Sequence, residues 1–361
     1  MRRTGNYPSN CWYVVATSAE VGRWFRATRA LDVPVLLYRT RAGGVVALED
    51  RDAHRPYPLS LGRLDGDNVV SGYTGFVYDP TGRCVHVPTQ EAIPFGAGVR
   101  SFPVYEGGSF VWAWFGEPAL AALRPPPQTP WLLDPAWATL GDGWETAANF
   151  QLLHENFADI THVAVVDPEI APPVLGSIPP PLEVEVSEST VSFSRTYPAS
   201  PLAPWHAELL GRPAPERFVQ REGGMFVGPG LWVDHWDVHL AGDPAGTTAG
   251  DPAGTAAGEP AETVAEEPVS QPVATFRFTH AVTPIGPNRT RHHWRVSRNF
   301  SPGAATDELL LPRFTAYYRR VQAILQTMQS VLDVDGPRDE VDVSADAAAL
   351  QVRRILAKLG S

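Results

Sequence analysis

Polar residues able to bind a metal or move a proton gather in one short stretch of this sequence, residues 149–170. The stretch contains Asn156, Asp159, His162 and Asp167. Imidazole and carboxylate groups can ligate a metal, and both can donate or accept protons. Burial of Asp167 would raise the pKa of its carboxyl group, which could then exchange a proton with His162 as its partner. Because three ligands from one short segment rarely complete a metal site, a hydrogen-bonded polar cluster is the favoured interpretation.

A second stretch, residues 47–90, places polar residues at the spacing of a cluster-binding motif. It reads Asp52-Ala53-His54, then Ser71-Gly72-Tyr73-Thr74. The stretch resembles the Rieske domain of Rieske non-haem iron oxygenases, in which C-x-H precedes C-x-x-H. A Rieske centre needs two thiolates and two imidazoles, and of the four positions His54 alone keeps the family's residue. The hydroxyls of Ser71 and Thr74 are not soft ligands for iron–sulfur iron. The resemblance therefore implies a Rieske fold without its cluster.

The first stretch resembles the iron-binding motif of the same family, D-x-x-H-x4-H. Asp159 and His162 match its acid and its first histidine, whereas Asp167 stands at the second histidine. In the family this acid connects the iron to the cluster of a neighbouring subunit. The third ligand, a carboxylate on a late helix, aligns with Val321, whose side chain cannot bind iron. The resemblance leaves His54 and His162 as the surviving family ligands, and it predicts neither a bound metal nor a cofactor.

Other histidines fall in stretches with the alternation of β-strands. His235 and His239 would share one face of a strand but lie about 13 Å apart, too far for a common metal. The adjacent residues His292 and His293 would point to opposite faces. We expect structural or cavity-lining roles for all four.

The pattern of apolar residues predicts an α+β fold with two domains. Short β-branched and aromatic runs predict an all-β, Rieske-like domain over residues 1–120. Residues 121–361 are expected to form a helix-grip domain, an antiparallel sheet with helices. Within it, residues 241–270 repeat small residues without large apolar side chains, which predicts a disordered insertion.

Helical periodicity appears in three parts of the second domain. It predicts helices over residues 146–166, 306–332 and 344–358. The long second helix carries an apolar stripe that should pack against the sheet.

Composition narrows the partners and the location. The chain has 361 residues, a net charge of −11 and scattered basic residues, which argues against a nucleic-acid partner. No apolar run approaches the roughly 20 residues of a membrane-spanning helix, and the N-terminal residues lack a signal-peptide pattern. The two cysteines, Cys11 and Cys84, are expected to be reduced thiols. We predict a cytoplasmic protein with neither a nucleic-acid nor a membrane partner.

The resemblance is strongest to the vanillate O-demethylase-like branch, whose members usually form homotrimers, so a homotrimer is possible here. Because both iron centres lack most of their ligands, the sequence favours a cofactor-independent cyclase. Its expected substrate is a small apolar natural product, a polyketide-like intermediate of specialised-metabolite (antibiotic) biosynthesis, and its expected reaction is a ring closure such as a cycloaddition. The predicted catalytic residues are Asn156, Asp159, His162 and Asp167. The predicted substrate pocket is formed by Trp232, Trp236, Trp294, Phe226 and Val321.

Two alternatives stay open at this point. One is a non-catalytic binding or scaffold subunit. The other is a Rieske-type oxygenase or demethylase with an atypical mononuclear metal site.

Overall fold

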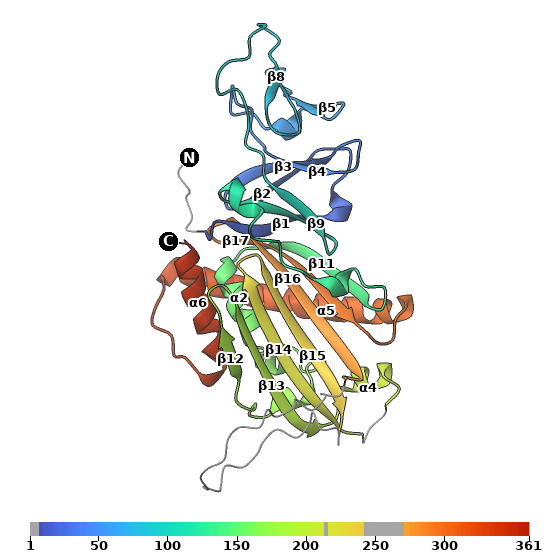
Figure 1. Ribbon diagram of the computed structural model, residues 1–361. Coiled ribbons are helices and arrows are strands. Elements are labelled where there is room, and N and C mark those ends of the chain that lie inside the picture. Colours follow the sequence, from blue (N-terminus) through green and yellow to red (C-terminus); the bar gives the residue numbers. More distant parts are fainter. Residues whose placement is uncertain (1–6, 213–215, 242–270, 361) are drawn as a thin grey trace, which may run out of the picture.

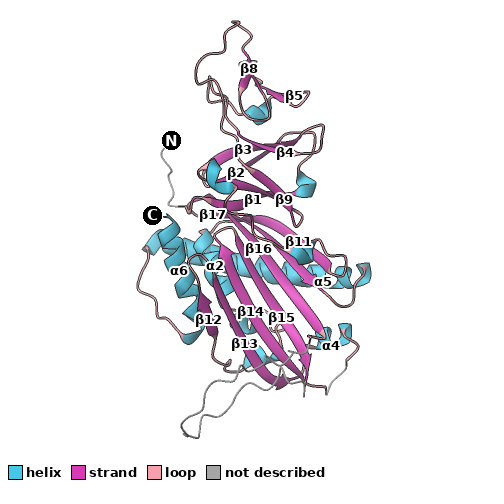
Figure 2. Ribbon diagram, viewed as in Figure 1, coloured by secondary structure: helices cyan, strands magenta, loops and turns pink. Residues whose placement is uncertain are grey.

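The computed structural model describes residues 7–212, 216–241 and 271–360. Strands dominate the N-terminal part of the chain, and a larger sheet with helices forms the C-terminal part (Figures 1 and 2). This is the α+β arrangement that the sequence predicts. The predicted insertion at 241–270 falls almost wholly on residues 242–270, which lie outside the described residues.

Small antiparallel sheets build the N-terminal part. The strands are β1 (Cys11–Thr17), β2 (Arg26–Ala30), β3 (Val33–Arg39), β4 (Val45–Glu49), β5 (Arg63–Asp65), β6 (Asn68–Val70), β7 (Val77–Tyr78), β8 (Cys84–His86), β9 (Val104–Gly107) and β10 (Phe110–Phe115). Among the described residues they pair in the orders β1-β10-β9, β2-β3-β4 and β5-β6-β7-β8. The β5–β8 sheet lies farthest from the C-terminal part (Figure 1). The β1-β10-β9 sheet lies next to the C-terminal part. A short helix, α1 (Pro118–Ala121), follows β10.

One large antiparallel sheet organises the C-terminal part. Its strands are β11 (Ala138–Thr146), β12 (Glu183–Val186), β13 (Val191–Ser200), β14 (Phe218–Gly228), β15 (Leu231–Leu240), β16 (Ala274–Gly286) and β17 (Arg289–Arg298). In the described residues their order is β11-β17-β16-β15-β14-β13-β12. The helices are α2 (Phe150–Ala158), α3 (Val163–Val166), α4 (Pro204–Leu209), α5 (Ala304–Asp335) and α6 (Ala347–Gly360). The long helix α5 crosses the sheet, and α6 lies beside α2 (Figure 1).

Strand alternation gives this sheet two different faces. His280 on β16 is opposite Trp294 on β17 and Trp232 on β15, and Trp232 is opposite Phe226 on β14. Because residues paired across an antiparallel sheet point the same way, these four side chains share one face. That face packs against α2 and α5: Phe157 of α2 stacks on His280, and Tyr318 of α5 contacts Trp294.

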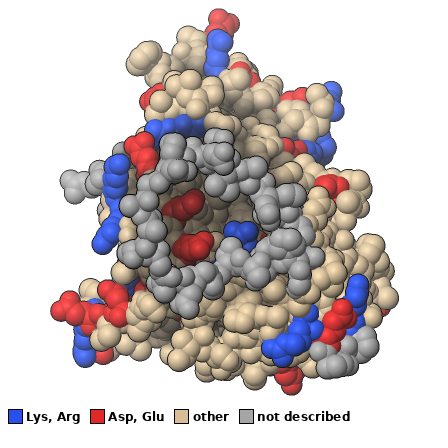
Figure 3. Space-filling model, turned by 60° about the horizontal axis from the view of Figure 1, so that its bottom comes forward, with Lys and Arg blue, Asp and Glu red and all other residues tan. Residues whose placement is uncertain are grey.

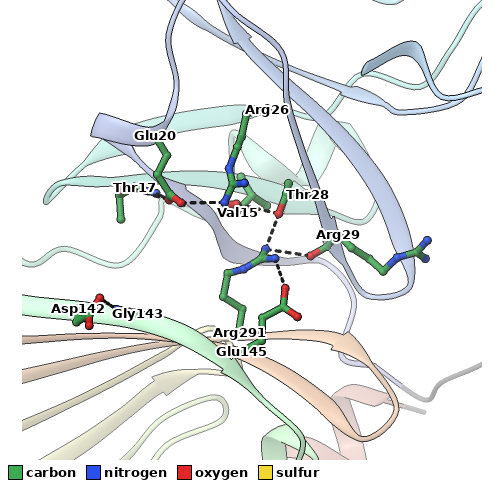
Figure 4. A network of polar contacts seen from close by, with 10 residues as sticks. All are labelled: Val15, Thr17, Glu20, Arg26, Thr28, Arg29, Asp142, Gly143, Glu145 and Arg291. Carbon is green, nitrogen blue, oxygen red and sulfur yellow. Dashed lines mark hydrogen bonds and ion pairs between the residues drawn. The ribbon is translucent and has the colours of Figure 1, made fainter. Parts of the chain in front are cut away.

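The opposite face of β17 meets the N-terminal part, as Figure 4 shows for Arg291. The Arg291 guanidinium donates hydrogen bonds to the Thr28 hydroxyl and to Glu145 Oε1, the latter at 2.9 Å. Thr28 in turn donates to the carbonyl of Val15 on β1 at 3.3 Å. In a second contact, the Thr283 hydroxyl of β16 donates a hydrogen bond to the Val14 carbonyl at 2.7 Å. These contacts fix the two parts of the chain against each other.

The helix expected over 146–166 is divided in two by the turn that contains Asp159. Asn149 begins α2 by accepting a hydrogen bond from the Gln151 backbone N–H at 2.8 Å. Asp159 then adopts an extended backbone, and its carboxylate accepts hydrogen bonds from the Thr161 backbone N–H and hydroxyl at 2.8 and 2.9 Å. Such local side-chain bonds compete with helical ones, so the helix stops and α3 starts afresh at Val163.

Candidate functional site

The four positions that match Rieske ligands form a hydrogen-bond network centred on Asp52. The Asp52 carboxylate is 2% exposed. It accepts hydrogen bonds from the His54 backbone N–H at 2.8 Å, the Thr74 hydroxyl at 2.5 Å and the Tyr78 hydroxyl at 3.0 Å. Burial alone would raise the pKa of Asp52, but the hydrogen bonds, including one from Ser71, together lower it below its usual value. The network connects the loop that contains Asp52 and His54 with the loop that contains Ser71 and Thr74.

The donor set at this place does not fit an iron–sulfur cluster. The His54 ring is exposed and stacks on Phe76, with ring centroids 5.4 Å apart. The nearby thiol of Cys84 is buried and donates to the His86 carbonyl at 3.5 Å, and burial raises the pKa of that thiol. Within the described ranges, no three His, Cys, Asp or Glu side chains come together as a metal site. Hydroxyls and a fully hydrogen-bonded carboxylate stand where thiolates and an imidazole would be needed.

The positions that match mononuclear iron ligands have also acquired protein partners. His162 Nδ1 lies 2.7 Å from the Asp159 carbonyl, which can only accept, so Nδ1 carries the proton. His162 Nε2 lies 3.2 Å from the Tyr317 hydroxyl and 3.3 Å from Asn156 Nδ2, and it accepts from them. Burial lowers the pKa of His162, which keeps the ring neutral.

Asp167 and Val321 do not complete a triad around His162. The Asp167 carboxylate is buried and pairs with Arg320 Nη1 at 2.6 Å. Val321 is 4% exposed and belongs to the apolar core under α2 and α6. The residues present therefore do not fit the family's iron site of two histidines and one carboxylate.

A cavity of about 110 Å³ lies beside His162, between the sheet and helices α2, α3 and α5. This is smaller than an engineered apolar cavity of about 150 Å³ that accepts benzene, so an aromatic ligand must displace part of the lining as it binds. The lining is mostly aromatic and aliphatic: Phe157, Ile160, Val163, Ile170, Pro172, Leu175, Phe193, Trp205, Trp236, Phe276, Phe278, Phe314, Tyr317 and Tyr318. Its polar members are Asn156, His162, His206, Glu222, Asp234, His235 and His280, with Gly223 beside them. A small, mainly apolar molecule is the kind of ligand that such a lining favours.

Only some of the predicted site residues line this cavity. Asn156, His162 and Trp236 do. Asp159 and Asp167 do not, because the first holds the turn before α3 and the second pairs with Arg320. The other predicted pocket residues pack into the core instead: Trp232, Trp294, Phe226 and Val321 are each at most 4% exposed.

The sequence interpretation missed the polar wall of the cavity, formed by Glu222, Asp234 and His280. Asp234 Oδ1 accepts a hydrogen bond from Trp232 Nε1 at 2.5 Å, and its Oδ2 lies 3.6 Å from His280 Nε2. His280 Nδ1 lies 3.1 Å from His292 Nε2. The available signal was the strand alternation of β15, in which Trp232, Asp234 and Trp236 share one face.

Burial controls the charge of this wall. It raises the pKa of Asp234 well above its usual value and raises that of Glu222 as well. It lowers the pKa of His280 to about 3. A carboxyl group with a raised pKa beside a neutral imidazole can exchange a proton with a bound molecule.

The histidines of β17 do point to opposite faces, which confirms that prediction. The His292 ring lies 5.4 Å from that of Phe157 on the cavity side of the sheet, whereas His293 contacts Phe110 of the N-terminal part.

Comparison with known proteins identifies the family. Residues 146–361 match the Vanillate O-demethylase oxygenase C-terminal domain, and residues 11–103 match the Rieske [2Fe-2S] domain. The chain belongs to the Rieske oxygenases of this type. It is 31% identical to the toluene-4-sulfonate monooxygenase system iron-sulfur subunit TsaM1 of Comamonas testosteroni, over 97% of this chain and 96% of that protein. The vanillate O-demethylase oxygenase subunit of Pseudomonas sp. (strain ATCC 19151) is 27% identical, with 91% and 94% covered.

Solved structures of this family share the fold over nearly the whole chain. Dicamba monooxygenase bound to 3,6-dichlorosalicylic acid superposes with a TM-score of 0.80 at 26% identity, covering 97% of each chain. The family resemblance and the fold class predicted from the sequence are confirmed.

The prediction of a cofactor-independent cyclase is wrong. The relatives compared are oxygenase components, namely monooxygenases and O-demethylases, and their names point neither to ring closure nor to antibiotic biosynthesis. The absence of a metal ligand excludes one kind of chemistry at that position, but it does not indicate which other reaction takes its place. What the relatives do support is that the chain belongs to a family of enzymes that act on small molecules. No helix in the described ranges is long and apolar enough to cross a membrane.

Proposed function

We propose that this chain is an enzyme that binds a small, largely aromatic molecule in the cavity beside His162 and exchanges a proton with its polar end. The observation that carries the proposal is the polar wall of an otherwise apolar cavity. There Asp234, with a raised pKa, has its Oδ2 3.6 Å from His280 Nε2. General acid–base catalysis commonly uses acidic and basic side chains with shifted pKa values that lie in a cleft.

Each polar residue has a distinct part in this proposal. Asp234 donates or accepts the proton, and His280 is its neighbour within the wall. His162 and Asn156 form a second polar contact at the α2–α3 end of the cavity. Asp159 acts as a positioning residue, because its carbonyl accepts from His162 Nδ1 at 2.7 Å and its carboxylate shapes the turn. Asp167 is assigned no proton transfer, since Arg320 already pairs with it.

Binding is tested by filling the cavity from α3. Val163 lines the cavity, whereas Val165 on the same short helix is 85% exposed. With 4-methylbenzyl alcohol as the probe, we expect Val163→Trp to abolish binding measured by titration calorimetry, and Val165→Trp to leave the affinity within about twofold. Equal affinities in the two variants would show that the molecule does not bind in this cavity.

Proton transfer is tested at Asp234 itself. With ¹³C-labelled aspartate, the NMR signal that disappears in Asp234→Asn should titrate well above the usual carboxyl pKa of about 3.9. Asp237→Asn on the same strand is the control, because Asp237 pairs with Arg277 at 2.9 Å and does not line the cavity. A titration of Asp234 in the ordinary carboxyl range would remove its proposed role.

A second candidate is an oxygenase or demethylase with an atypical mononuclear metal site. Membership of the family and the retention of His162 at a ligand position favour it. Anaerobic titration with Fe(II) decides between the two candidates. The oxygenase candidate requires stoichiometric binding that is lost in His162→Ala. The acid–base proposal expects the same weak binding in both proteins.

A further inference from the structure

The charges around the cavity restrict what its ligand can be. On the face shown in Figure 3, basic and acidic side chains occur together. The cavity lining differs, because in the described chain its acidic members are Glu222 and Asp234 and it contains neither lysine nor arginine.

The histidines of the lining do not supply a positive charge. Burial lowers the pKa of His206 and His235 to about 4 and that of His280 to about 3. At neutral pH these rings are uncharged. A carboxylate or sulfonate entering the cavity would lose its water and meet no lysine or arginine of the lining, and the buried Arg195 beside the wall is already paired with Glu222. Such a burial of a charge is strongly unfavourable.

Some residues of the lining also carry buried polar atoms that have no hydrogen-bond partner among the described residues. Glu222 Oε2 accepts a hydrogen bond from the Tyr197 hydroxyl at 2.5 Å and lies 3.3 Å from Arg195 Nε. Glu222 Oε1, on a side chain 3% exposed, has no hydrogen-bond partner among the described residues. The Trp205 indole N–H, also at the lining, likewise has none within the described chain. Buried polar groups without a partner are uncommon, so a bound molecule is a natural source of the missing bonds.

We infer that the cavity takes an uncharged aromatic molecule with a hydroxyl group, and rejects aromatic acids. A hydroxyl can donate to an acceptor such as Glu222 Oε1 and can accept from a donor such as the Trp205 N–H. This inference rests on the proposed function and names its substrate class. It separates the chain from relatives whose names specify acids: toluene-4-sulfonate for one and 3,6-dichlorosalicylic acid for another.

Three probes of one shape test the inference on the full chain. They are 4-methylbenzyl alcohol, its methyl ether, which lacks the donor, and toluene-4-sulfonate, which carries a charge. Titration calorimetry at pH 7 should give an affinity for the alcohol at least tenfold higher than for the ether or the sulfonate. An equal or higher affinity for the sulfonate overturns the inference, and so does an equal affinity for the ether.

Two variants complete the design. Glu222→Gln keeps the shape but leaves one acceptor oxygen, which the Tyr197 hydroxyl occupies, and places an NH₂ donor where Oε1 was. The alcohol should therefore bind at least fivefold more weakly, and the sulfonate, which can only accept, at least fivefold more tightly. Glu185→Gln, at an exposed position outside the cavity, should change neither. No rise in sulfonate affinity with folded Glu222→Gln overturns the charge argument.

The outcomes distinguish this inference from the function on which it rests. If the sulfonate binds better and Val163→Trp blocks it, the cavity is a binding site and only the ligand class is wrong. If none of the probes binds, or Val163→Trp affects none of them, both the inference and the proposed function fail.

Discussion

The Asp52 network and the surroundings of His162 occupy corresponding places in the two domains, since each stands where the family holds iron. In the first, a carboxylate has become the centre of a closed network and collects hydrogen bonds from His54, Thr74 and Tyr78. In the second, a histidine is kept, while Asp167 has turned to Arg320 and a cavity stays open beside the histidine.

The comparison shows two different arrangements at the positions that match the family's metal ligands. At the N-terminal place Asp52 connects the segments 52–54 and 71–78 through hydrogen bonds. At the C-terminal place a cavity lies beside His162, and Asp234 with the buried Glu222 and His280 forms its polar wall. The first place is therefore expected to govern stability, and the second to govern binding.

The largest effect is expected from rebuilding the cluster ligands. Asp52→Cys, Ser71→Cys and Thr74→His together with the native His54 restore the C-x-H and C-x-x-H pattern. The two segments that carry these positions approach closely, because the Thr74 hydroxyl donates to Asp52 Oδ2 at 2.5 Å. We expect the triple variant to gain the visible absorption of a Rieske cluster after reconstitution. If a folded variant gains none, the loops have moved as well as the ligands.

Breaking the Asp52 network should cost several hydrogen bonds at once. Asp52→Ala leaves buried donors without an acceptor, and we expect a loss of about 3 kcal/mol in the free energy of unfolding. Hydrogen exchange should rise mainly in peptides from residues 47–90. The matched control is Asp65→Ala at an exposed position, with an expected loss within about 0.5 kcal/mol. Equal losses in both variants would contradict the stabilising role of the network.

The two parts of the chain should also respond differently to acid. Burial lowers the pKa of His154, fully buried on α2, to about 4, so between about pH 6.5 and 4 the unfolded chain binds a proton that the folded chain does not. The free energy of unfolding therefore decreases as the pH is lowered through that window. The lowered pKa of Asp52 acts at lower pH: its contribution is complete above about pH 4 and is lost below.

His154→Phe measures this difference directly. Removing one such site should reduce the dependence of unfolding free energy on pH by up to about 1.4 kcal/mol per pH unit inside the window. His86→Phe, at an exposed position of β8, serves as the control and should leave the slope unchanged. The same slope in both variants would show that acid sensitivity does not arise from the buried C-terminal histidines.

The smallest effect is expected at the Asp167–Arg320 pair, because Arg320 is 54% exposed and water can replace part of the interaction. Arg320→Ala should cost about 1 kcal/mol. The double variant with Asp167→Asn should recover part of that loss, since the buried charge is gone. No coupling between the two substitutions would mean that Asp167 does not depend on Arg320.

The sequence predicted what depends on local pattern. Strand alternation placed His292 and His293 on opposite faces, and the motif spacing located both former iron sites. The local pattern could not predict that Asp167 pairs with Arg320, because the two residues lie far apart along the chain. They meet only where α5 crosses the sheet. The polar wall was missed for a related reason: Asp234 and His280 sit on neighbouring strands, and only the sheet register brings them together.

The central claim is that neither domain keeps the residues that hold iron in this family. Iron and acid-labile sulfide can be measured in the purified chain beside dicamba monooxygenase, for which a structure with non-haem iron is known. Both proteins should be produced and reconstituted in the same way. We predict cluster absorption and stoichiometric iron in dicamba monooxygenase, and neither in this chain. Stoichiometric iron with Rieske absorption in this chain would contradict the account.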